Sequence, residues 1–145
     1  MLNISHYKII AIGKIKKKWI QEGIRMYLNR LPGLQVIEIK GSTQMKEEST
    51  IKESIKKNET LVTLCENGQR YTSKQFAKKL LGCNNQNITF AIGGPIGLSS
   101  SLISSADWQL SLSPLTFPHE IARLLLLEQL YRAKTITEGG PYHRQ

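Results

Sequence analysis

This chain of 145 residues is poor in the residues that build disulfide frameworks, metal sites and membrane spans. Its two cysteines, Cys65 and Cys83, lie far apart and form no CxxC pair, so we expect reduced thiols. The three histidines have no metal-ligand spacing with one another or with the cysteines, so no metal site is expected. No stretch approaches the roughly 20 apolar residues that span a bilayer, and no signal peptide is recognisable. These absences predict a cytoplasmic protein without a membrane segment.

The glycine motifs of common nucleotide-binding folds are also missing. Gly13 follows the first apolar run alone, without a GxGxxG pattern or an acidic residue about twenty positions further on. The phosphate-binding pattern GxxxxGK[ST] does not occur. The run GGPIG at residues 93–97 follows a later apolar segment, and its pattern alone fits a tight turn as well as a ligand-binding loop.

Acidic residues are scarce relative to basic ones. The chain has 20 lysines and arginines against 11 aspartates and glutamates, a formal net charge of +9. Such a balance favours an acidic partner, with nucleic acid first and an anionic membrane surface second. The charge is concentrated at residues 14–18, where four of the five residues are lysine. This run is either a solvated helix face or a surface that binds phosphates, and the pattern leaves both open.

Apolar periodicity predicts an alternation of strands and helices. The predicted strands are residues 7–12, 34–39, 60–65, 88–92 and 108–112. The predicted helices are residues 19–31, an exposed segment around 51–55, and residues 72–81, 98–106 and 118–134. Thr72 and Gln75 form a capping box, whereas Asn67-Gly68 is expected to be a turn. The alternation predicts one α/β domain over residues 1–145, with a mainly parallel sheet flanked by helices.

The last predicted helix is apolar around most of its circumference. Its four consecutive leucines, residues 124–127, must point in several directions. Burying all four is worth roughly 6–12 kcal/mol. One sheet face can cover only one side of a helix, so a second packing surface is needed, most simply that of a two-fold homodimer. The alternative is a helix that is buried entirely within its own domain.

A long uncharged stretch precedes that helix. From residue 88 to residue 118 the only charged side chain is Asp107. In a parallel sheet the loops at the carboxyl ends of adjacent strands meet, and ligands bind there. Three such loops are unusual in this chain, at residues 64–68, 93–97 and 112–117. The last two carry no charge, which suits a mostly apolar ligand held by backbone donors and acceptors.

The C-terminal tail carries three side chains suited to chemistry. Gly139-Gly140-Pro141 ends the helix, and Tyr142, His143 and Arg144 then offer stacking, proton transfer and a fixed positive charge. A frayed terminus without function is the alternative. His119, at the other end of the helix, is expected to bond to neighbouring backbone groups.

Four segments of the chain resemble one known family. They are residues 8–31 (KIIAIGKIKKKWIQEGIRMYLNRL), 64–77 (LCENGQRYTSKQFA), 90–98 (FAIGGPIGL) and 110–145 (LSLSPLTFPHEIARLLLLEQLYRAKTITEGGPYHRQ). They are similar to the RlmH family, the ribosomal RNA large-subunit pseudouridine N3-methyltransferases of the SPOUT superfamily. The last segment is the most specific. The resemblance implies an α/β fold with a C-terminal trefoil knot, S-adenosylmethionine as the cofactor, and a homodimer.

The resemblance also assigns site residues. The cofactor-binding residues it implies are Leu64, Gly93, Leu112, Ser113, Pro114, Leu115, Thr116 and Phe117. Tyr142, His143 and Arg144 are expected to reach the partner's active site across the dimer. There Arg144 would supply positive charge, His143 is a candidate base, and Tyr142 would stack on or position the nucleotide. Pro114 is a departure, because the family more often has lysine or alanine at this position.

The substrate implied by the resemblance is a pseudouridine in a loop of the large-subunit (23S) rRNA, methylated at N3 on the assembled ribosome. Two alternatives remain open from the sequence. One is a non-enzymatic ribosome-binding factor that kept the fold. The other is a SPOUT methyltransferase that acts on tRNA. The intact loops and tail favour an enzyme over the first, and the absence of an added RNA-binding domain disfavours the second.

Overall fold

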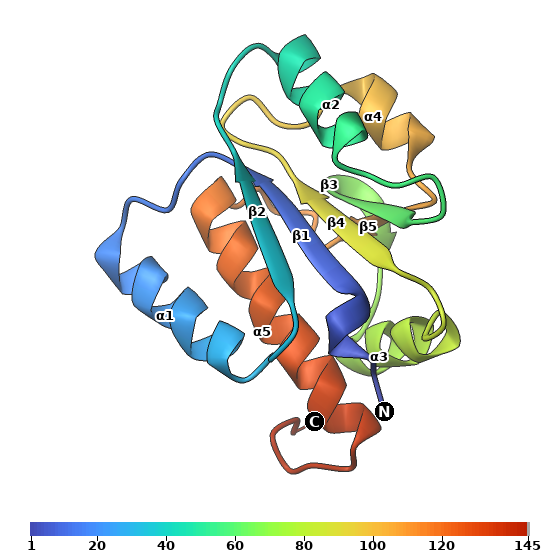
Figure 1. Cartoon of the computed structure of the whole chain (residues 1–145). Coiled ribbons are helices and arrows are strands. Elements are labelled where there is room, and N and C mark those ends of the chain that lie inside the picture. The colour runs from blue at the N-terminus through green and yellow to red at the C-terminus, as the bar shows by residue number, and fades with distance from the viewer. Residues whose placement is uncertain (145) are drawn as a thin grey trace.

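In the computed structural model, which describes residues 1–144, a parallel sheet lies between two layers of helices (Figure 1). The strands are β1 (Tyr7–Ile12), β2 (Gln35–Ile39), β3 (Thr60–Arg70), β4 (Ile88–Ile92) and β5 (Trp108–Ser111). The helices are α1 (Lys18–Asn29), α2 (Gln44–Glu53), α3 (Ser73–Gly82), α4 (Ser100–Ser105) and α5 (His119–Thr137), with a short 3-10 turn at Ile4–His6. The five strands have the order β2-β1-β4-β3-β5, and all four pairings are parallel. The predicted α/β fold is therefore confirmed.

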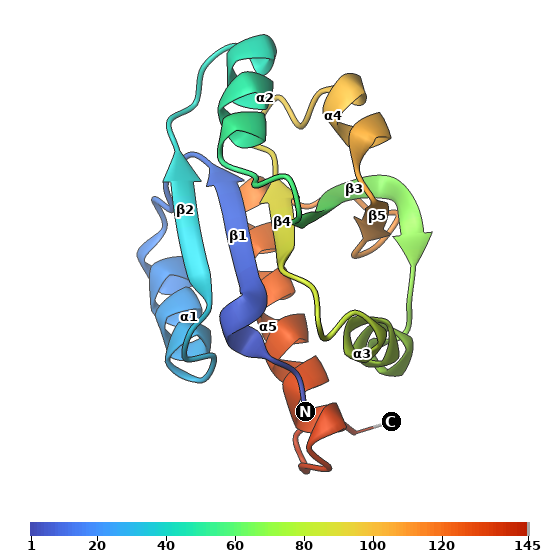
Figure 2. The ribbon, with the colours of Figure 1, turned by 45° about the vertical axis from the view of Figure 1, so that its right-hand side comes forward.

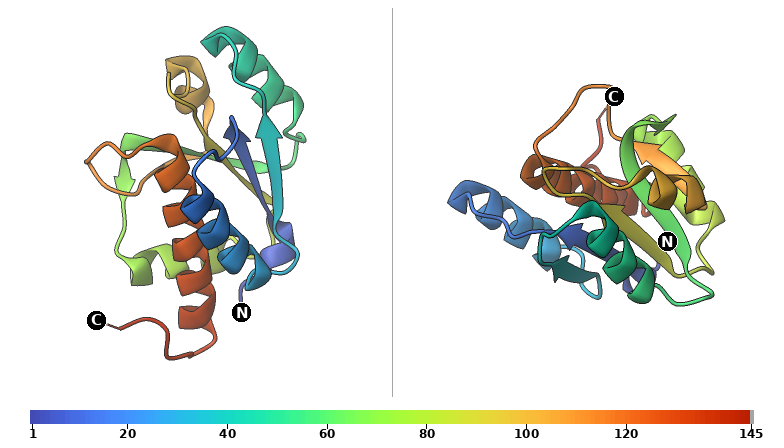
Figure 3. Two further views of the ribbon diagram at one scale, coloured as in Figure 1. Left: turned by 90° about the vertical axis from the view of Figure 1, so that its left-hand side faces the viewer. Right: turned by 90° about the horizontal axis from the view of Figure 1, so that it is seen from above.

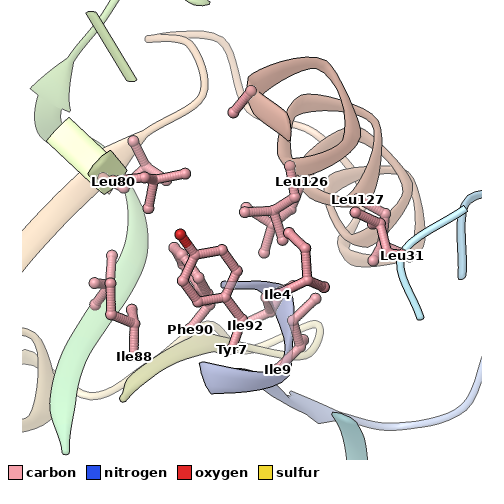
Figure 4. Packing of buried hydrophobic residues seen from close by; sticks show 14 of the residues in the cluster. Ile4, Tyr7, Ile9, Leu31, Leu80, Ile88, Phe90, Ile92, Leu126 and Leu127 are labelled. Carbon is pink, nitrogen blue, oxygen red and sulfur yellow. The ribbon is translucent and has the colours of Figure 1, made fainter. Parts of the chain in front are cut away.

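Successive residues of the central strands point to opposite faces of the sheet and build two separate cores. Ile9 and Phe90 belong to the larger core, which lies under α1, α3 and α5, and Figure 4 shows its tight packing around Tyr7. Ile10 and Ala91 belong to the smaller core, under α2 and α4. Figure 2 shows α1 and α5 behind the strands and α2 and α4 near the upper end of the sheet. The central strands β1 and β4 are covered on both faces, which explains why they read as nearly continuous apolar runs, whereas the edge strand β2 is partly exposed.

The leucine run of α5 is divided between the core and the surface. Leu126 and Leu127 are fully buried beneath the helix, whereas Leu124 and Leu125 stay half-exposed. Leu124 packs closely over Gly23 of α1, where an added Cβ would lie 3.1 Å from its Cδ1. One chain therefore does not bury all four leucines, and the predicted second packing surface remains a prediction.

The structure corrects the predicted end of β3. We expected this strand to stop at residue 65 and to be followed by a turn at Asn67-Gly68, but β3 continues to Arg70. Leu64 and Gln69 both pair with Leu110 of β5, so the four residues between them form an irregularity inside the strand. At Gly68 an added Cβ would lie 2.9 Å from backbone atoms of Gln109. Glycine is needed here for this close backbone approach rather than for a hairpin.

Smaller differences concern the helix ends. The capping box of Thr72 and Gln75 is confirmed at the start of α3. α5 continues to Thr137, three residues beyond its predicted end, because Gly139 with φ 73° is what ends it. Of the lysine run, only Lys18 lies in α1; the residues before it form the loop after β1. Within residues 1–144, no helix is both long and apolar enough to cross a membrane.

Candidate functional site

A cavity of ≈ 710 Å³ lies beyond the carboxyl ends of β4 and β5 and beside residues 64–66 in the middle of β3. Its walls come from three loops and from His119 and Ala122 in the first turn of α5. The loops contribute residues 64–66, 92–98 without residue 96, and 112–118 without residue 114. Parallel strands end at the same edge of a sheet, which brings these distant segments together. The three segments predicted to meet do meet, although the first of them lies within β3 rather than in a loop.

Most of the residues expected to bind a cofactor lie in the walls of this cavity. They are Leu64, Gly93, Leu112, Ser113, Leu115, Thr116 and Phe117. Pro114 is exposed and does not line it. The Ser113 Oγ accepts a hydrogen bond from the Leu115 N–H at 3.1 Å, so the loop bends tightly around Pro114. Leu115 is left 70% exposed, an apolar side chain at the mouth of the cavity.

The glycine loop after β4 is folded tightly back on itself. An added Cβ at Gly93 would lie 2.7 Å from the carbonyl carbon of Gly97 and 2.7 Å from the Leu98 nitrogen. Gly97 has φ +74°, in the left-handed region that favours glycine. The loop therefore presents backbone to the cavity with no side chain at Gly93, so a ligand can approach the main chain closely.

Charge is sparse in the cavity walls. Glu66 is the one carboxylate among the described residues that line it. Cys65 lies beside Glu66, and burial raises the pKa of its thiol, which favours the protonated form. No group of three or more histidine, cysteine or acidic side chains within residues 1–144 could hold a metal. The cavity suits a neutral or weakly charged ligand.

The lysine-rich loop after β1 is fixed against the start of α5, next to the cavity. The Glu120 carboxylate accepts hydrogen bonds from the backbone N–H groups of Lys17 at 3.2 Å and Lys16 at 3.0 Å, and these bonds lower its pKa. Arg123, which is buried, donates to the Gly13 carbonyl at 2.9 Å and pairs with Glu38. The backbone that carries these exposed lysines is thereby held against the first turn of α5.

The C-terminal tail is anchored on the outer face of α5. The Tyr142 hydroxyl donates to Glu128 Oε2 at 2.8 Å and lies 3.1 Å from the Tyr27 hydroxyl of α1. Its ring packs edge-on against Tyr131 at a centroid distance of 4.7 Å. Burial, together with the bonds to Tyr27 and Glu128, raises the pKa of Tyr142, so the phenol stays neutral at physiological pH.

The contact with Arg132 determines which ring nitrogen of His143 carries the proton in the neutral imidazole. One guanidinium nitrogen of Arg132 lies 3.1 Å from His143 Nδ1, and another pairs with Glu128 at 2.6 Å. A guanidinium only donates, so Nδ1 accepts, and the neutral imidazole carries its proton on Nε2. In this arrangement His143 is a donor through Nε2. It can serve as a base only after the contact with Arg132 is broken. Arg144 is exposed.

One chain does not bring the tail to the cavity. Ala122 is the last residue of α5 that lines the cavity, whereas Arg132, which holds the tail, lies ten residues further along α5, or ~15 Å at 1.5 Å per residue. Figure 3 shows the two ends of α5 far apart. Sequence reasoning missed Glu128 and Arg132, which anchor the tail. Their i,i+4 spacing was the available signal, but the same spacing is common in surface ion pairs without function.

Comparisons with known proteins agree with this geometry. Residues 5–143 match the family described as "Predicted SPOUT methyltransferase". The ribosomal RNA large subunit methyltransferase H of Prochlorococcus marinus (strain NATL2A) is 79% identical over 145 residues, covering 100% of both chains. A probable methylase family protein from Haemophilus influenzae Rd KW20 has a similar fold, with TM-score 0.67, 13% identity, and 99% of this chain and 72% of that chain covered.

A second solved structure is that of the SpoU methyltransferase AviRb from Streptomyces viridochromogenes in complex with AdoMet. It aligns with a TM-score of 0.51 at 13% identity, covering 92% of this chain and 58% of that chain. At such low identity the structural matches show the fold alone. The full-length match at 79% identity and the family model over residues 5–143 go further. The chain belongs to the SPOUT methyltransferases and, among them, to the family of ribosomal RNA large subunit methyltransferase H.

Proposed function

We propose that this chain transfers a methyl group from S-adenosylmethionine to N3 of a pseudouridine in a loop of 23S rRNA on the assembled ribosome. The observation that carries the proposal is the cavity formed by three nearly uncharged loops in a chain that matches a ribosomal RNA methyltransferase over its full length. Its net charge of +9 suits an RNA substrate.

The cavity fits S-adenosylmethionine in size and chemistry. Its ≈ 710 Å³ lies within the range of ~300–1,000 Å³ typical of small-molecule sites. Leu64, Leu112 and Phe117 provide apolar walls for an adenine ring. The bare backbone at Gly93 allows close main-chain contact, and Glu66 can accept hydrogen bonds from ribose hydroxyls or from the methionine ammonium group. When bound there, the cofactor supplies an electrophilic methyl group on its sulfonium.

We further propose that the active site is shared between two chains of a homodimer. Glu128 and Arg132, which hold Tyr142 and His143, lie ~9 Å and ~15 Å along α5 beyond Ala122, the last helix residue that lines the cavity of their own chain. Leu125, which is only partly buried and does not belong to the core, leaves α5 with an apolar side chain for a partner. A two-fold dimer that covers this side chain can place one chain's tail at its partner's cavity.

In the shared site the tail prepares the nucleotide for transfer. N3 must approach in line with the methyl group, so positioning supplies much of the catalysis. N3 also carries a proton that must leave as the N–C bond forms. The fixed charge of Arg144 favours the deprotonated ring, and each pK unit of that shift is worth about 1.36 kcal/mol. Tyr142, neutral and anchored by Glu128, is suited to stack on the base.

His143 is restricted in its ability to act as the proton acceptor. Its Nδ1 lone pair is occupied by Arg132 at 3.1 Å. We propose that His143 binds the nucleotide through its Nε2–H, and that it accepts the N3 proton only when substrate binding releases Nδ1 from Arg132. Until then, a proton acceptor other than His143 is required.

The proposed knot is formed by the loops that line the cavity. Support for the knot comes from the family match over residues 5–143. Near the cavity, Leu64 and Gln69 both pair with Leu110, and the Ser111 hydroxyl donates to the Glu66 carbonyl at 3.0 Å. These contacts hold the β3 irregularity against the end of β5. We propose that residues 1–145 form a single SPOUT domain with this C-terminal trefoil knot, working in the cytoplasm on ribosomes. Gln145 lies outside the described residues.

The direct test is the transfer of labelled methyl from S-adenosylmethionine to ribosomes that lack this modification, with free rRNA and tRNA as controls. We expect label on one pseudouridine of the large subunit, with free rRNA and tRNA unlabelled. Label on tRNA would support the proposed cofactor but contradict the proposed substrate. Cofactor binding without transfer to any of the RNAs would favour a ribosome-binding factor instead.

A further inference from the structure

A second cavity, of ≈ 550 Å³, lies between the end of β3 and α3. Arg70 comes from the strand, and Lys78 and Lys79 come from the helix. The amide side chains of Gln69 and Gln75 also line it. Neither the proposed cofactor site nor the C-terminal tail uses this cavity.

The charge around the second cavity is unbalanced. Arg70, Lys78 and Lys79 are all exposed, and within residues 1–144 none of them makes a salt bridge. No acidic residue is among the described residues that line the cavity. Three cations held around one hollow repel one another unless an anion lies between them. The cavity is therefore electrostatically suited to an anionic ligand.

The wall of the cavity is partly rigid. The Lys79 ammonium lies 5.3 Å from the centre of the Trp108 ring, which fixes the direction of this long side chain. Trp108 packs in turn against Tyr71, another lining residue, with an edge-on geometry at 6.0 Å. This arrangement differs from a set of freely moving surface lysines, because one of the cations is held in place before any ligand binds.

The two cavities are neighbours along the β3–β5 ladder. Leu64 lines the first cavity and Gln69 lines the second, and both pair with Leu110. Each lies one strand spacing from Leu110, so their backbones are at most about 10 Å apart. A polymer with one unit in the first cavity can therefore reach the second with units close by in its sequence.

We propose that the second cavity binds backbone phosphates of the RNA strand whose target nucleotide enters the first cavity. This inference rests on the proposed function for its choice of RNA. Arg70 and Lys78 contact the phosphates, and the amides of Gln69 and Gln75 are suited to ribose hydroxyls. An anionic membrane fits less well, because interfacial binding needs exposed aliphatic side chains beside the cations, and the lining residues provide none.

The test compares two double variants that each remove two positive charges. Arg70→Gln with Lys78→Gln removes the proposed contacts, while Lys79 is kept because it packs on Trp108. Lys56→Gln with Lys57→Gln is the matched control, since both lysines are exposed and lie in the connection between α2 and β3. Binding of a labelled single-stranded RNA oligonucleotide and of large ribosomal subunits is measured over a salt series. S-adenosylmethionine affinity checks that each variant is folded.

Losing two phosphate contacts should flatten the slope of log K against log salt by ~1.4 for a single strand. The control variant should keep the wild-type slope. Equal slopes for the two double variants would overturn the proposal. Weaker binding to subunits with unchanged binding to the oligonucleotide would also overturn it, in favour of an acidic protein partner.

Wild-type methyl transfer to ribosomes, measured in parallel, separates the two claims. Transfer by the wild type together with equal slopes means that only the second cavity was misassigned. A flattened slope without any transfer by the wild type means that the cavity binds RNA and the proposed reaction is wrong.

Discussion

At the scale of single residues, Arg132 connects the parts of the tail. Its guanidinium pairs with Glu128, donates to His143 Nδ1, and lies 4.8 Å from the centre of the Tyr142 ring. The pairing with Glu128 raises the pKa of Arg132, so the guanidinium remains a donor at any working pH. The tail is thus held in one conformation rather than frayed, although it lies close to the chain terminus. Such pre-organisation lowers the entropic cost of presenting these side chains to a substrate.

Arg144→Ala is the residue-scale test of catalysis. We expect turnover on ribosomes to fall by about 10²–10³-fold, as when one electrostatic donor is removed from an active site. S-adenosylmethionine affinity, measured by calorimetry, should stay unchanged because Arg144 is proposed to act on the nucleotide rather than on the cofactor. Arg25→Ala, which removes an exposed arginine from α1, is the matched control. Full turnover in Arg144→Ala would show that the tail has no catalytic role.

Glu120 gives a pH-dependent test of the loop after β1. The backbone N–H groups of Lys17 and Lys16 lower the pKa of Glu120 in the folded chain. Its stabilising contribution is therefore present above the ordinary carboxyl range and is lost as pH falls through the folded-state pKa. Glu120→Gln should lower the free energy of unfolding by about 1 kcal/mol at neutral pH. The difference from wild type should shrink near pH 3, as measured by urea titration.

Glu53→Gln, at an exposed carboxylate of α2, is the control for this measurement. A destabilisation by Glu120→Gln that is the same at both pH values would mean that the ionised carboxylate does not hold the loop.

At the scale of elements, the close backbone contact between the parallel strands β3 and β5 positions both cavities. Gly68 lies against the backbone of Gln109 with no room for a side chain. The Ser111 hydroxyl bonds to the Glu66 carbonyl across the same junction. Residues 64–66 are thereby directed to the first cavity, and residues 69–71 to the second. The irregularity in β3 is thus part of the site rather than a defect of the strand.

Gly68→Ala tests this contact between the two strands. The added methyl would lie 2.9 Å from the backbone of Gln109, so one strand must shift. We expect a loss of about 1–3 kcal/mol in the free energy of unfolding, measured by denaturant titration. Gly82→Ala is the matched control, because it ends α3 and its Cβ would meet nothing within 4 Å. The control should be neutral or stabilising by up to ~1 kcal/mol. Equal stability of the two variants would contradict the close backbone contact between β3 and β5.

The order of the elements was largely predictable from the sequence, because apolar runs and turn residues set it directly. The capping box at Thr72 and the runs in β1 and β4 are local signals, and the structure confirms them. The end of β3 was not predictable in this way. Asn67-Gly68 has the composition of a hairpin turn, and only the distant backbone of Gln109 explains the glycine. Such long-range contacts cannot be recognised from the local sequence pattern.

At the scale of the whole molecule, the two halves of the proposed site lie at different positions along one helix. The cavity is built around His119, and the tail is anchored at Glu128 and Arg132. The loops of the cavity could be predicted because parallel strands bring their ends together. The separation of the tail from the cavity could not be predicted, because it depends on where the tail folds back along α5. That separation of ~9–15 Å along α5 is the geometric reason for proposing a site shared between two chains.

The measurement that most directly tests a shared site is complementation between two inactive variants. Ala122→Phe fills the cavity that Ala122 lines, and Arg144→Ala removes the charge of the tail. Each variant alone should be inactive on ribosomes. When equal amounts are unfolded, mixed and refolded, about half of the dimers combine both chains. Each mixed dimer then has one intact site, so roughly a quarter of wild-type activity should return. No recovery, with mixed dimers verified by mass spectrometry, would contradict a site shared between chains.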